Sequence, residues 1–195
     1  MQSLKDEEVM LNYQKGEVSA MDELLARYKK PIYCFVFRLT GNGAEAQDIA
    51  QEVFLKLHQH KDDYRPTGKF STWIFSIAHN LSISKLRKNK WQVFWPRKKD
   101  DPDELVEFVS PDPSPQEVVS ENDLNAVVKS CIQSLPFLQK EALILCEYEK
   151  LDYQEIARIL KKSLGTIKTL IHRARANLKT KLLPYVEEFG GGSNV

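Results

Sequence analysis

The segment YQEIARILKKSLGTIKTLIHRARANLKTKL, residues 153–182, contains two helical patterns separated by a polar break at 161–163. The first pattern places Ile156, Ala157 and Leu160 on one face. In the second, apolar residues recur every three or four positions, the period of one helical face: Ile167, Ile171, Ala174, Leu178 and Leu182. A small residue where two helices cross, a tight turn and a basic second helix predict a helix-turn-helix, a motif that reads DNA.

The outer face of the second predicted helix carries groups that suit DNA. In a helix-turn-helix the N-terminal residues of the second helix reach base edges in the major groove. Ser163 can cap this helix, whereas Lys168 and Arg173 can donate hydrogen bonds to guanine edges. Arg175 comes later and is better placed for the DNA backbone. A solvated basic face without a ligand is the alternative, but the adjoining helix and turn favour DNA. The predicted contacts are Ser163, Thr166, Lys168, Thr169, His172, Arg173 and Arg175.

The net charge of +1 conceals a strong segregation of charge along the chain. Residues 64–99 contain nine basic residues and no acidic one, and residues 100–128 contain nine acidic residues and no basic one. Residues 156–186 contain eight basic residues and no acidic one. Chance clustering on solvated faces is the alternative, but three successive blocks favour two contacts with a polyanion and a connector that avoids nucleic acid.

Length and composition limit the class of protein. The 195 residues suffice for one large or two small domains, and a mean hydropathy of -0.42 is typical of a soluble protein. No apolar run approaches the roughly 20 residues that span a bilayer, and the acidic N-terminus lacks a signal-peptide pattern. The three cysteines are widely spaced, which predicts reduced core thiols in a cytoplasmic protein.

Almost every other segment has a helical pattern, and no apolar and polar alternation predicts a sheet. Helices are expected over 6–15, 19–28, 44–59 and 70–89, with a further helix restarting at Pro31 and ending near Gly41. Five prolines and many acidic residues between 95 and 120 predict an extended, flexible linker. Helical spacing resumes at 124–135, and Pro136 is expected to begin another helix.

An enzyme is an alternative because four potential metal ligands lie close together in the sequence: His58, His60, Asp62 and Asp63. Two residues that are two apart on a helix point to different sides, so His58 and His60 are not expected to share a metal. The sequence shows neither a glycine-rich phosphate loop nor a nucleophile paired with a base. No catalytic residue, metal site or cofactor is therefore predicted.

Two motifs together resemble the bacterial RNA polymerase sigma factors of the extracytoplasmic-function (ECF) group. The first is AQDIAQEVFLKLH with GKFSTWIFSIAHNLSISKLRK, within 46–88, and the second is LDYQEIARILKKSLGTIKTLIHRARANL, 151–178. Their order, with an acidic proline-containing linker between them, makes the resemblance specific.

The resemblance implies an all-α protein with two small helical domains. Residues 1–95 would be sigma domain two, which binds core RNA polymerase and melts the minus-ten promoter element. Residues 121–186 would be sigma domain four, which reads the minus-thirty-five element. Residues 96–120 would be the linker, and 187–195 a flexible tail. An anti-sigma factor is a further implied partner, and no direct membrane insertion is expected.

The resemblance also assigns roles in the first domain. Asp48, Gln51, Glu52 and Leu55 share one helical face, with which the family grips the polymerase clamp helices. Such an exposed strip is otherwise a solvated face. Aromatic, amide and basic groups would take up unpaired bases and phosphates of the minus-ten element, with the alternative that Phe70 and Trp73 are core residues: Lys69, Phe70, Trp73, Asn80, Ser84, Lys85, Arg87 and Lys88.

Three positions depart from the family pattern. Ser84 stands where many ECF sigma factors carry Asp, and Leu170 stands where Arg is frequent. Lys161 occupies a turn position where Gly is frequent, so either a positive φ there costs about 1 kcal/mol or the turn differs. These departures affect the promoter sequence that is read rather than the motif. A different DNA-binding regulator, such as a response regulator with a similar C-terminal DNA-binding domain, is the other alternative. It would need a receiver domain of alternating strands and helices, a pattern that residues 1–95 do not show.

Overall fold

The structure is a computed structural model that describes residues 4–91 and 124–190. Within these two ranges it contains eight α-helices and one 3-10 turn but no strand, which confirms the all-α prediction. The predicted linker at 96–120 lies outside the described residues. None of the helices in these ranges combines the length and the apolar character that a membrane span requires.

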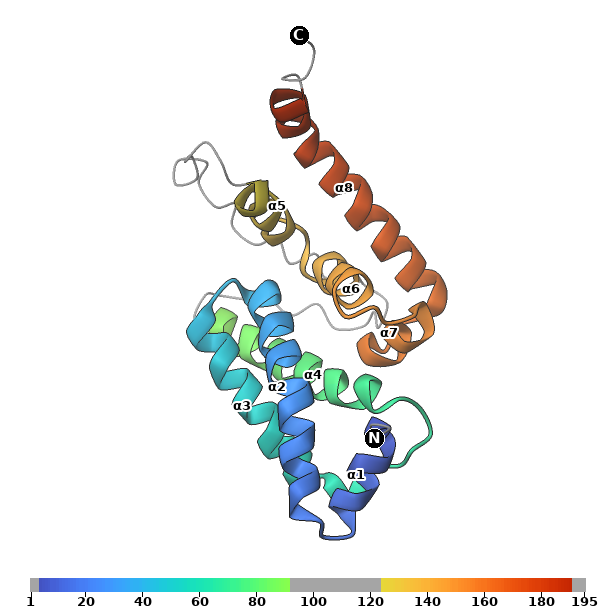
Figure 1. Ribbon diagram of the computed structural model, residues 1–195. Helices are drawn as coiled ribbons and strands as arrows, with labels where there is room; N and C mark the ends of the chain where they lie inside the picture. Colours follow the sequence, from blue (N-terminus) through green and yellow to red (C-terminus); the bar gives the residue numbers. More distant parts are fainter. Residues whose placement is uncertain (1–3, 92–123, 191–195) are drawn as a thin grey trace.

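Four helices and the 3-10 turn form the first domain (Figure 1): α1 (Asp6–Gln14), α2 (Val18–Thr40), α3 (Gly43–Gln59), η1 (Lys61–Asp63) and α4 (Phe70–Trp91). α2 ends at Gly41, whose φ of 74° is the left-handed conformation that glycine adopts without strain. Asn42 then caps α3, because its side chain accepts a hydrogen bond from the Glu45 backbone N–H at 3.1 Å. The two adjacent caps allow α3 to fold back along α2.

The sequence pattern predicted a helix restart at Pro31, but α2 continues through this residue. Apolar side chains on both sides of Pro31 are buried in the same core, among them Leu24, Ile32 and Phe35. Burial of this long face outweighs the cost of one backbone N–H that proline cannot donate. The expected pair of short helices is therefore a single helix of 23 residues.

The remaining four helices form the second domain: α5 (Leu124–Gln133), α6 (Phe137–Glu147), α7 (Tyr153–Leu160) and α8 (Leu164–Gly190). Pro136 caps α6 immediately before its first residue, close to its predicted place. α8 extends eight residues past the predicted helical pattern, which ended at Leu182.

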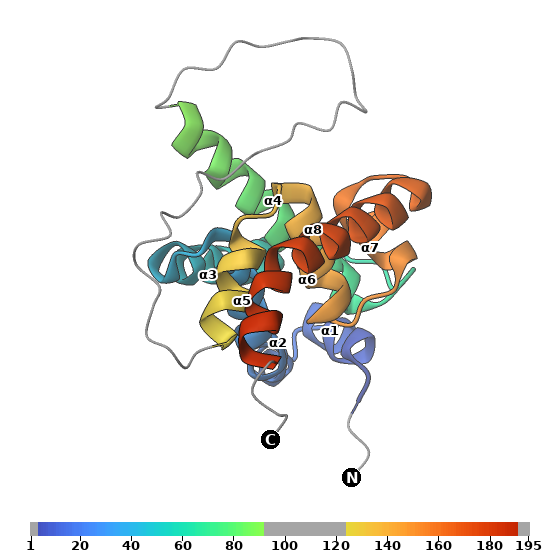
Figure 2. The same cartoon turned by 90° about the horizontal axis from the view of Figure 1, so that it is seen from above.

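The two domains pack against each other. α6 lies between α8 and the first domain, and α7 lies beside the beginning of α4 (Figures 1 and 2). Buried apolar residues of both domains belong to one continuous cluster, which includes Phe35 and Phe75 from the first domain and Ile144 and Ile156 from the second. The sequence patterns did not predict this direct contact.

Candidate nucleic-acid interfaces

The helix-turn-helix begins with a reciprocal cap. The Asp152 side chain accepts a hydrogen bond from the Glu155 backbone N–H at 2.8 Å, and the Glu155 side chain accepts one from the Asp152 backbone N–H at 2.9 Å. The backbone hydrogen bond from Glu155 lowers the pKa of the Asp152 carboxyl group. These bonds fix the start of α7 and thereby the angle at which it enters the motif.

The turn between α7 and α8 has a positive φ at Lys161, the first of the two alternatives given above. Lys161 adopts φ 53° and ψ 44°, which is left-handed and disfavoured for a residue with a Cβ atom. The apolar faces on either side hold the turn in place, since Ile156, Leu160 and Ile167 are all buried. The motif therefore forms with Lys161 where glycine would be unstrained.

The first turns of α8 present several of the predicted DNA-contacting groups. Lys168, His172 and Arg173 are exposed. Ser163 caps the helix, its hydroxyl accepting a hydrogen bond from the Thr166 backbone N–H at 3.1 Å, and the Thr169 hydroxyl donates to the Gly165 carbonyl at 3.0 Å. Leu170 is buried, so it packs inward and supplies no contact to DNA.

Arg175, another predicted contact, forms an ion pair with an acidic side chain of the protein. Its guanidinium group donates two hydrogen bonds to the Glu147 carboxylate, at 2.5 and 3.1 Å. This pairing raises the pKa of Arg175. The pair joins the end of α6 to α8 and holds the Arg175 side chain against the protein. Among the described residues, no salt bridge of this kind is seen for Lys168 or Arg173.

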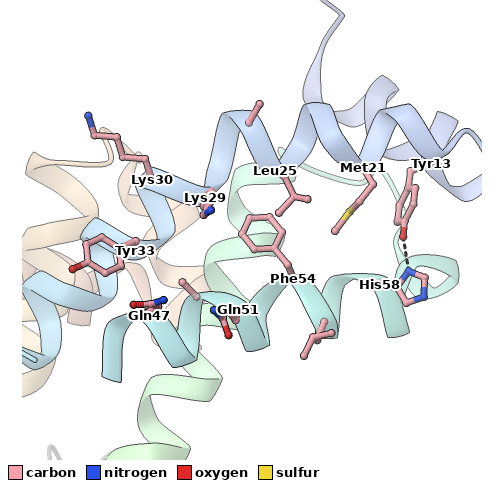
Figure 3. A pocket seen from close by; sticks show the side chains of 13 residues that line it. Tyr13, Met21, Leu25, Lys29, Lys30, Tyr33, Gln47, Gln51, Phe54 and His58 are labelled. Atoms are coloured by element: carbon pink, nitrogen blue, oxygen red, sulfur yellow. Dashed lines mark hydrogen bonds between the residues drawn. The ribbon is translucent and has the colours of Figure 1, made fainter. Parts of the chain in front are cut away.

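The face of α3 predicted to bind polymerase is open to solvent. Asp48, Gln51 and Glu52 are exposed, and the side chain of Leu55 is 60% exposed. A groove of about 1010 Å³ runs beside this face, between α2 and α3. Met21 and Leu25 of α2 face Phe54 of α3 across it (Figure 3), so its centre is apolar.

The ends of the groove are polar. Tyr13 forms a 2.5 Å hydrogen bond with Nδ1 of His58 at one end, and Lys29, Lys30 and Gln47 lie towards the other (Figure 3). The groove and the exposed Leu55 together form an apolar recess on the first domain, an arrangement that fits a partner helix.

The proposed minus-ten residues separate into exposed and buried groups. The Phe70 side chain is fully buried in a cluster of aromatic rings with Tyr28, Tyr64 and Trp73, so its ring is not available to stack on a base. Its burial favours the structural alternative, and Trp73 is half-buried in the same cluster. Lys69, by contrast, has a 64% exposed side chain.

Further along α4, Asn80, Ser84, Arg87 and Lys88 are exposed, and Lys85 is half-buried. The Ser84 hydroxyl donates to the backbone carbonyl of Asn80 at 2.8 Å, so it is occupied within the helix. The exposed part of α4 thus presents amide and basic groups in a row along the helix, an arrangement that can bind a nucleic-acid strand.

The four potential metal ligands in the last turn of α3 and just after it do not converge. His58 bonds to Tyr13, whereas Nδ1 of His60 lies 3.0 Å from the Asp63 carboxylate in η1. Across residues 4–91 and 124–190, no group of three or more His, Cys, Asp or Glu side chains is arranged to hold a metal ion.

Family comparison matches both halves of the chain. Residues 24–92 match the family described as Sigma-70 region 2, and residues 126–178 match Sigma-70, region 4. These two ranges contain α3, α4 and the helix-turn-helix, the elements that carry the exposed groups described above.

Similarity extends over nearly full length in several proteins. The chain is 33% identical to the ECF RNA polymerase sigma factor SigW of Bacillus subtilis, over 86% of this chain and 91% of that one. It is 31% identical to the RNA polymerase sigma-H factor of Pseudomonas aeruginosa, over 94% and 97%. The fold is similar to that of the sigma factor RpoE from Bartonella quintana, solved with the anti-sigma factor NepR: TM-score 0.65, 22% identity, 85% of this chain and 98% of that one.

Proposed function

The chain belongs to the ECF group of RNA polymerase sigma factors, and from this premise we propose how its residues divide the recognition of a promoter. A sigma factor is a transcription initiation factor rather than an enzyme: it directs core RNA polymerase to specific promoters, and the polymerase performs RNA synthesis. Residues 4–91 contain no strand, so the receiver domain that a response regulator would need is not present there.

Core polymerase is held by the exposed face of α3 together with the adjoining groove. Asp48 and Glu52 supply negative charge for basic groups on the polymerase, and Leu55 supplies an exposed apolar contact. The apolar centre formed by Leu25 and Phe54 lies beside them. A charged rim around an apolar centre is the usual composition of a protein interface.

The minus-ten element is contacted by the loop at 64–69 and by the exposed side of α4. Lys69, Arg87 and Lys88 hold phosphates, and Asn80 offers an amide that can read the edge of an unpaired base. The half-buried Trp73 ring packs against Phe70. Phe70 itself belongs to the buried core next to the loop.

The minus-thirty-five element is read by the beginning of α8. Lys168, His172 and Arg173 are the exposed groups that can reach base edges, and Ser163 and Thr166 bring the helix start to a phosphate. The single observation that carries this role is the capped, buried helix-turn-helix with a basic outer face.

The protein acts in the cytoplasm, where core polymerase and the promoter are. An anti-sigma factor is a further partner, a proposal supported by the fold shared with RpoE, which was solved bound to NepR.

Run-off transcription on a promoter library tests the whole assignment. Core polymerase with this chain should yield transcripts from a defined subset of promoters that core polymerase alone does not produce. If the transcripts are the same with and without the chain, the proposed function is wrong.

A further inference from the structure

The loop proposed to contact the minus-ten element is exposed along its length but anchored at both ends. Residues 65–69 are all exposed. Tyr64 before them is 2% exposed and Phe70 after them 0%, and the two rings pack edge to face with their centroids 5.9 Å apart. The loop therefore leaves the core and returns to it at one aromatic pair, and whatever holds the main chain at this pair also sets the shape of the loop.

The bonds that the loop makes within itself are local. The Arg65 guanidinium group donates to the Tyr64 carbonyl at 2.9 Å and to the Asp62 carbonyl at 2.6 Å. The Thr67 backbone N–H donates to the Arg65 carbonyl at 2.8 Å. Each of these bonds spans at most three residues, so they stabilise bends in the chain but do not attach its main chain to the rest of the first domain.

Two side chains of α1 provide that attachment, one on each side of the loop. The Gln14 amide group donates to the Lys61 carbonyl at 2.5 Å and to the Tyr64 carbonyl at 3.0 Å. The Glu7 carboxylate accepts a hydrogen bond from the Phe70 backbone N–H at 2.7 Å. Phe70 begins α4, and the first N–H groups of a helix have no acceptor within it. Glu7 thus caps α4 from 63 positions away in the sequence.

α1 is itself firmly attached to the domain. Asp6 forms an ion pair with Arg27 of α2 and accepts a hydrogen bond from the Tyr28 hydroxyl at 2.5 Å. The buried side chains along the rest of α1 pack into the core of the first domain. α1 therefore presents the Glu7 carboxylate and the Gln14 amide from a fixed position, which a flexible segment could not do.

We propose that Glu7 and Gln14 are positioning residues for the loop at 64–69: they fix its main chain before DNA binds, so that discrimination between minus-ten sequences depends on α1. This inference rests on the proposed function of that loop. It extends the function to a helix outside residues 24–92, the range that matches region 2. A loop that samples several conformations binds with an affinity reduced by the competent fraction, and a pocket that reads an extruded base must be held in place.

Four single variants separate these bonds from other effects of substitution. E7A removes the acceptor for the Phe70 N–H, whereas E7Q keeps an oxygen acceptor and loses only the charge. Q14M has a side chain of similar length that cannot donate to the loop carbonyls. E8A is the matched control, because it removes a neighbouring carboxylate that bonds within α1, to the Lys5 backbone N–H at 3.1 Å.

The first measurement is the discrimination of the holoenzyme between matched and mismatched single-stranded minus-ten oligonucleotides, taken from the most active promoter of the library test. E7A and Q14M should reduce the ratio of the two affinities about tenfold, the value of roughly one hydrogen bond. The loss falls on the matched strand, because phosphate contacts along α4 hold a mismatched strand without the loop. E7Q and E8A should stay within about twofold of the wild type.

The preference for a matched minus-thirty-five duplex should be unchanged in all four variants, because α8 reads that element from the second domain. Both ratios are independent of the amount of active protein. A variant that is merely less stable therefore leaves the minus-ten ratio unchanged, whereas a misplaced loop lowers it.

Hydrogen exchange of the free full-length proteins is the second measurement. Loss of an acceptor or donor on α1 should raise the exchange of amides in residues 61–70 about tenfold in E7A and Q14M, and the Phe70 amide should respond most in E7A. Exchange in α8 should stay at the wild-type rate. E7Q and E8A should protect the loop as the wild type does.

Three results would overturn the proposal: exchange in 61–70 that is unchanged in both E7A and Q14M, a minus-ten ratio that is unchanged in both, or equal defects in E7A and E8A. An E7Q variant as defective as E7A would show that the charge of Glu7 acts rather than its bond to Phe70. Failure of the proposed function is distinguishable from these, because the wild-type holoenzyme itself would then show no preference between minus-ten strands.

Discussion

His79 on α4 and Glu141 on α6 lie 62 positions apart in sequence, yet Nδ1 of the histidine and a carboxylate oxygen of the glutamate are 2.7 Å apart in a buried site between the domains. The pair makes the arrangement of the two promoter-reading units a property of the folded chain and not of the linker alone.

The polymerase-binding face of α3 can be tested by charge reversal. D48K/E52K should weaken binding to core polymerase by about tenfold, roughly 1.4 kcal/mol, because two attractive pairs become repulsive. Both side chains are exposed, so folding should not change. A titration of core polymerase without DNA measures the effect. D22K/D62K, with the same change in net charge at exposed positions off this face, is the matched control. Equal affinity of the two double variants would remove the assignment.

The base-reading role of Arg173 predicts a loss of sequence discrimination. R173A should reduce the preference of the holoenzyme for its minus-thirty-five sequence by about 1–3 kcal/mol, the value of one good bidentate contact. Competition between matched and mismatched duplexes measures this preference. R175A is the comparison, since Arg175 is held by Glu147 and should mainly lower affinity for both duplexes alike. The assignment is incorrect if R173A weakens both duplexes equally.

The sequence predicted the local features of this motif well because they depend on neighbouring residues. The apolar period of α8 and the cap at Ser163 follow from short-range patterns, whereas the positive φ at Lys161 was implied by the family resemblance. By contrast, the polar run at Lys140 and Glu141 has the appearance of a solvent-exposed face. Its burial depends on the first domain, 101 positions away for the Lys140 bond to Leu39, and no local pattern reports such a contact.

Two other differences have the same origin. Phe70 stands in a motif of aromatic and basic residues that suits base stacking, but the rings of Tyr28 and Tyr64 enclose it. Pro31 is a strong helix-breaking signal, but apolar residues on both sides of it are buried in one core and keep α2 continuous. In both cases, burial of apolar side chains in the tertiary structure outweighed what the neighbouring residues alone would favour.

Relief of the strained turn should stabilise the protein. K161G removes the Cβ atom from a residue with φ 53° and should raise the free energy of unfolding by about 1 kcal/mol. Urea unfolding followed by circular dichroism measures the change. K162G serves as the control, because Lys162 is not among the residues with positive φ and glycine there relieves no backbone strain. A stability gain in K162G equal to that in K161G would show that strain is not the cause.

The cap at Asp152 predicts a particular dependence on acid. Its pKa is lowered in the folded state by the backbone hydrogen bond from Glu155, so its contribution is present above the usual pKa of an aspartate and is lost as the pH falls through the folded value. Between pH 5 and 3 the wild type should therefore lose more stability than D152N, whose amide cannot titrate. Parallel stability curves for the two proteins would contradict this role of the cap.

Lys140 predicts the opposite dependence, at alkaline pH. Burial lowers its pKa to about 8, because the charged form has lost most of its water and has as acceptors two oxygen atoms among the described residues, the Leu39 carbonyl and the Gln133 amide oxygen. Between about pH 8 and 10 the unfolded chain binds a proton that the folded chain has released, so stability gains from this residue as the pH rises. The gain should approach, at most, about 1.4 kcal/mol per pH unit.

K140M should remove this gain and, because a methionine needs no hydration, should also unfold at higher urea concentration than the wild type at pH 7. Urea unfolding at pH 7.5, 8.5 and 9.5 compares the two proteins. Other groups titrate in this range in both of them, so the difference between their slopes isolates Lys140. K179M, at an exposed position of α8, should follow the wild-type slope. If K140M also follows the wild-type slope, Lys140 stays charged in the folded protein, and the interface between the domains must then admit water around its ammonium group.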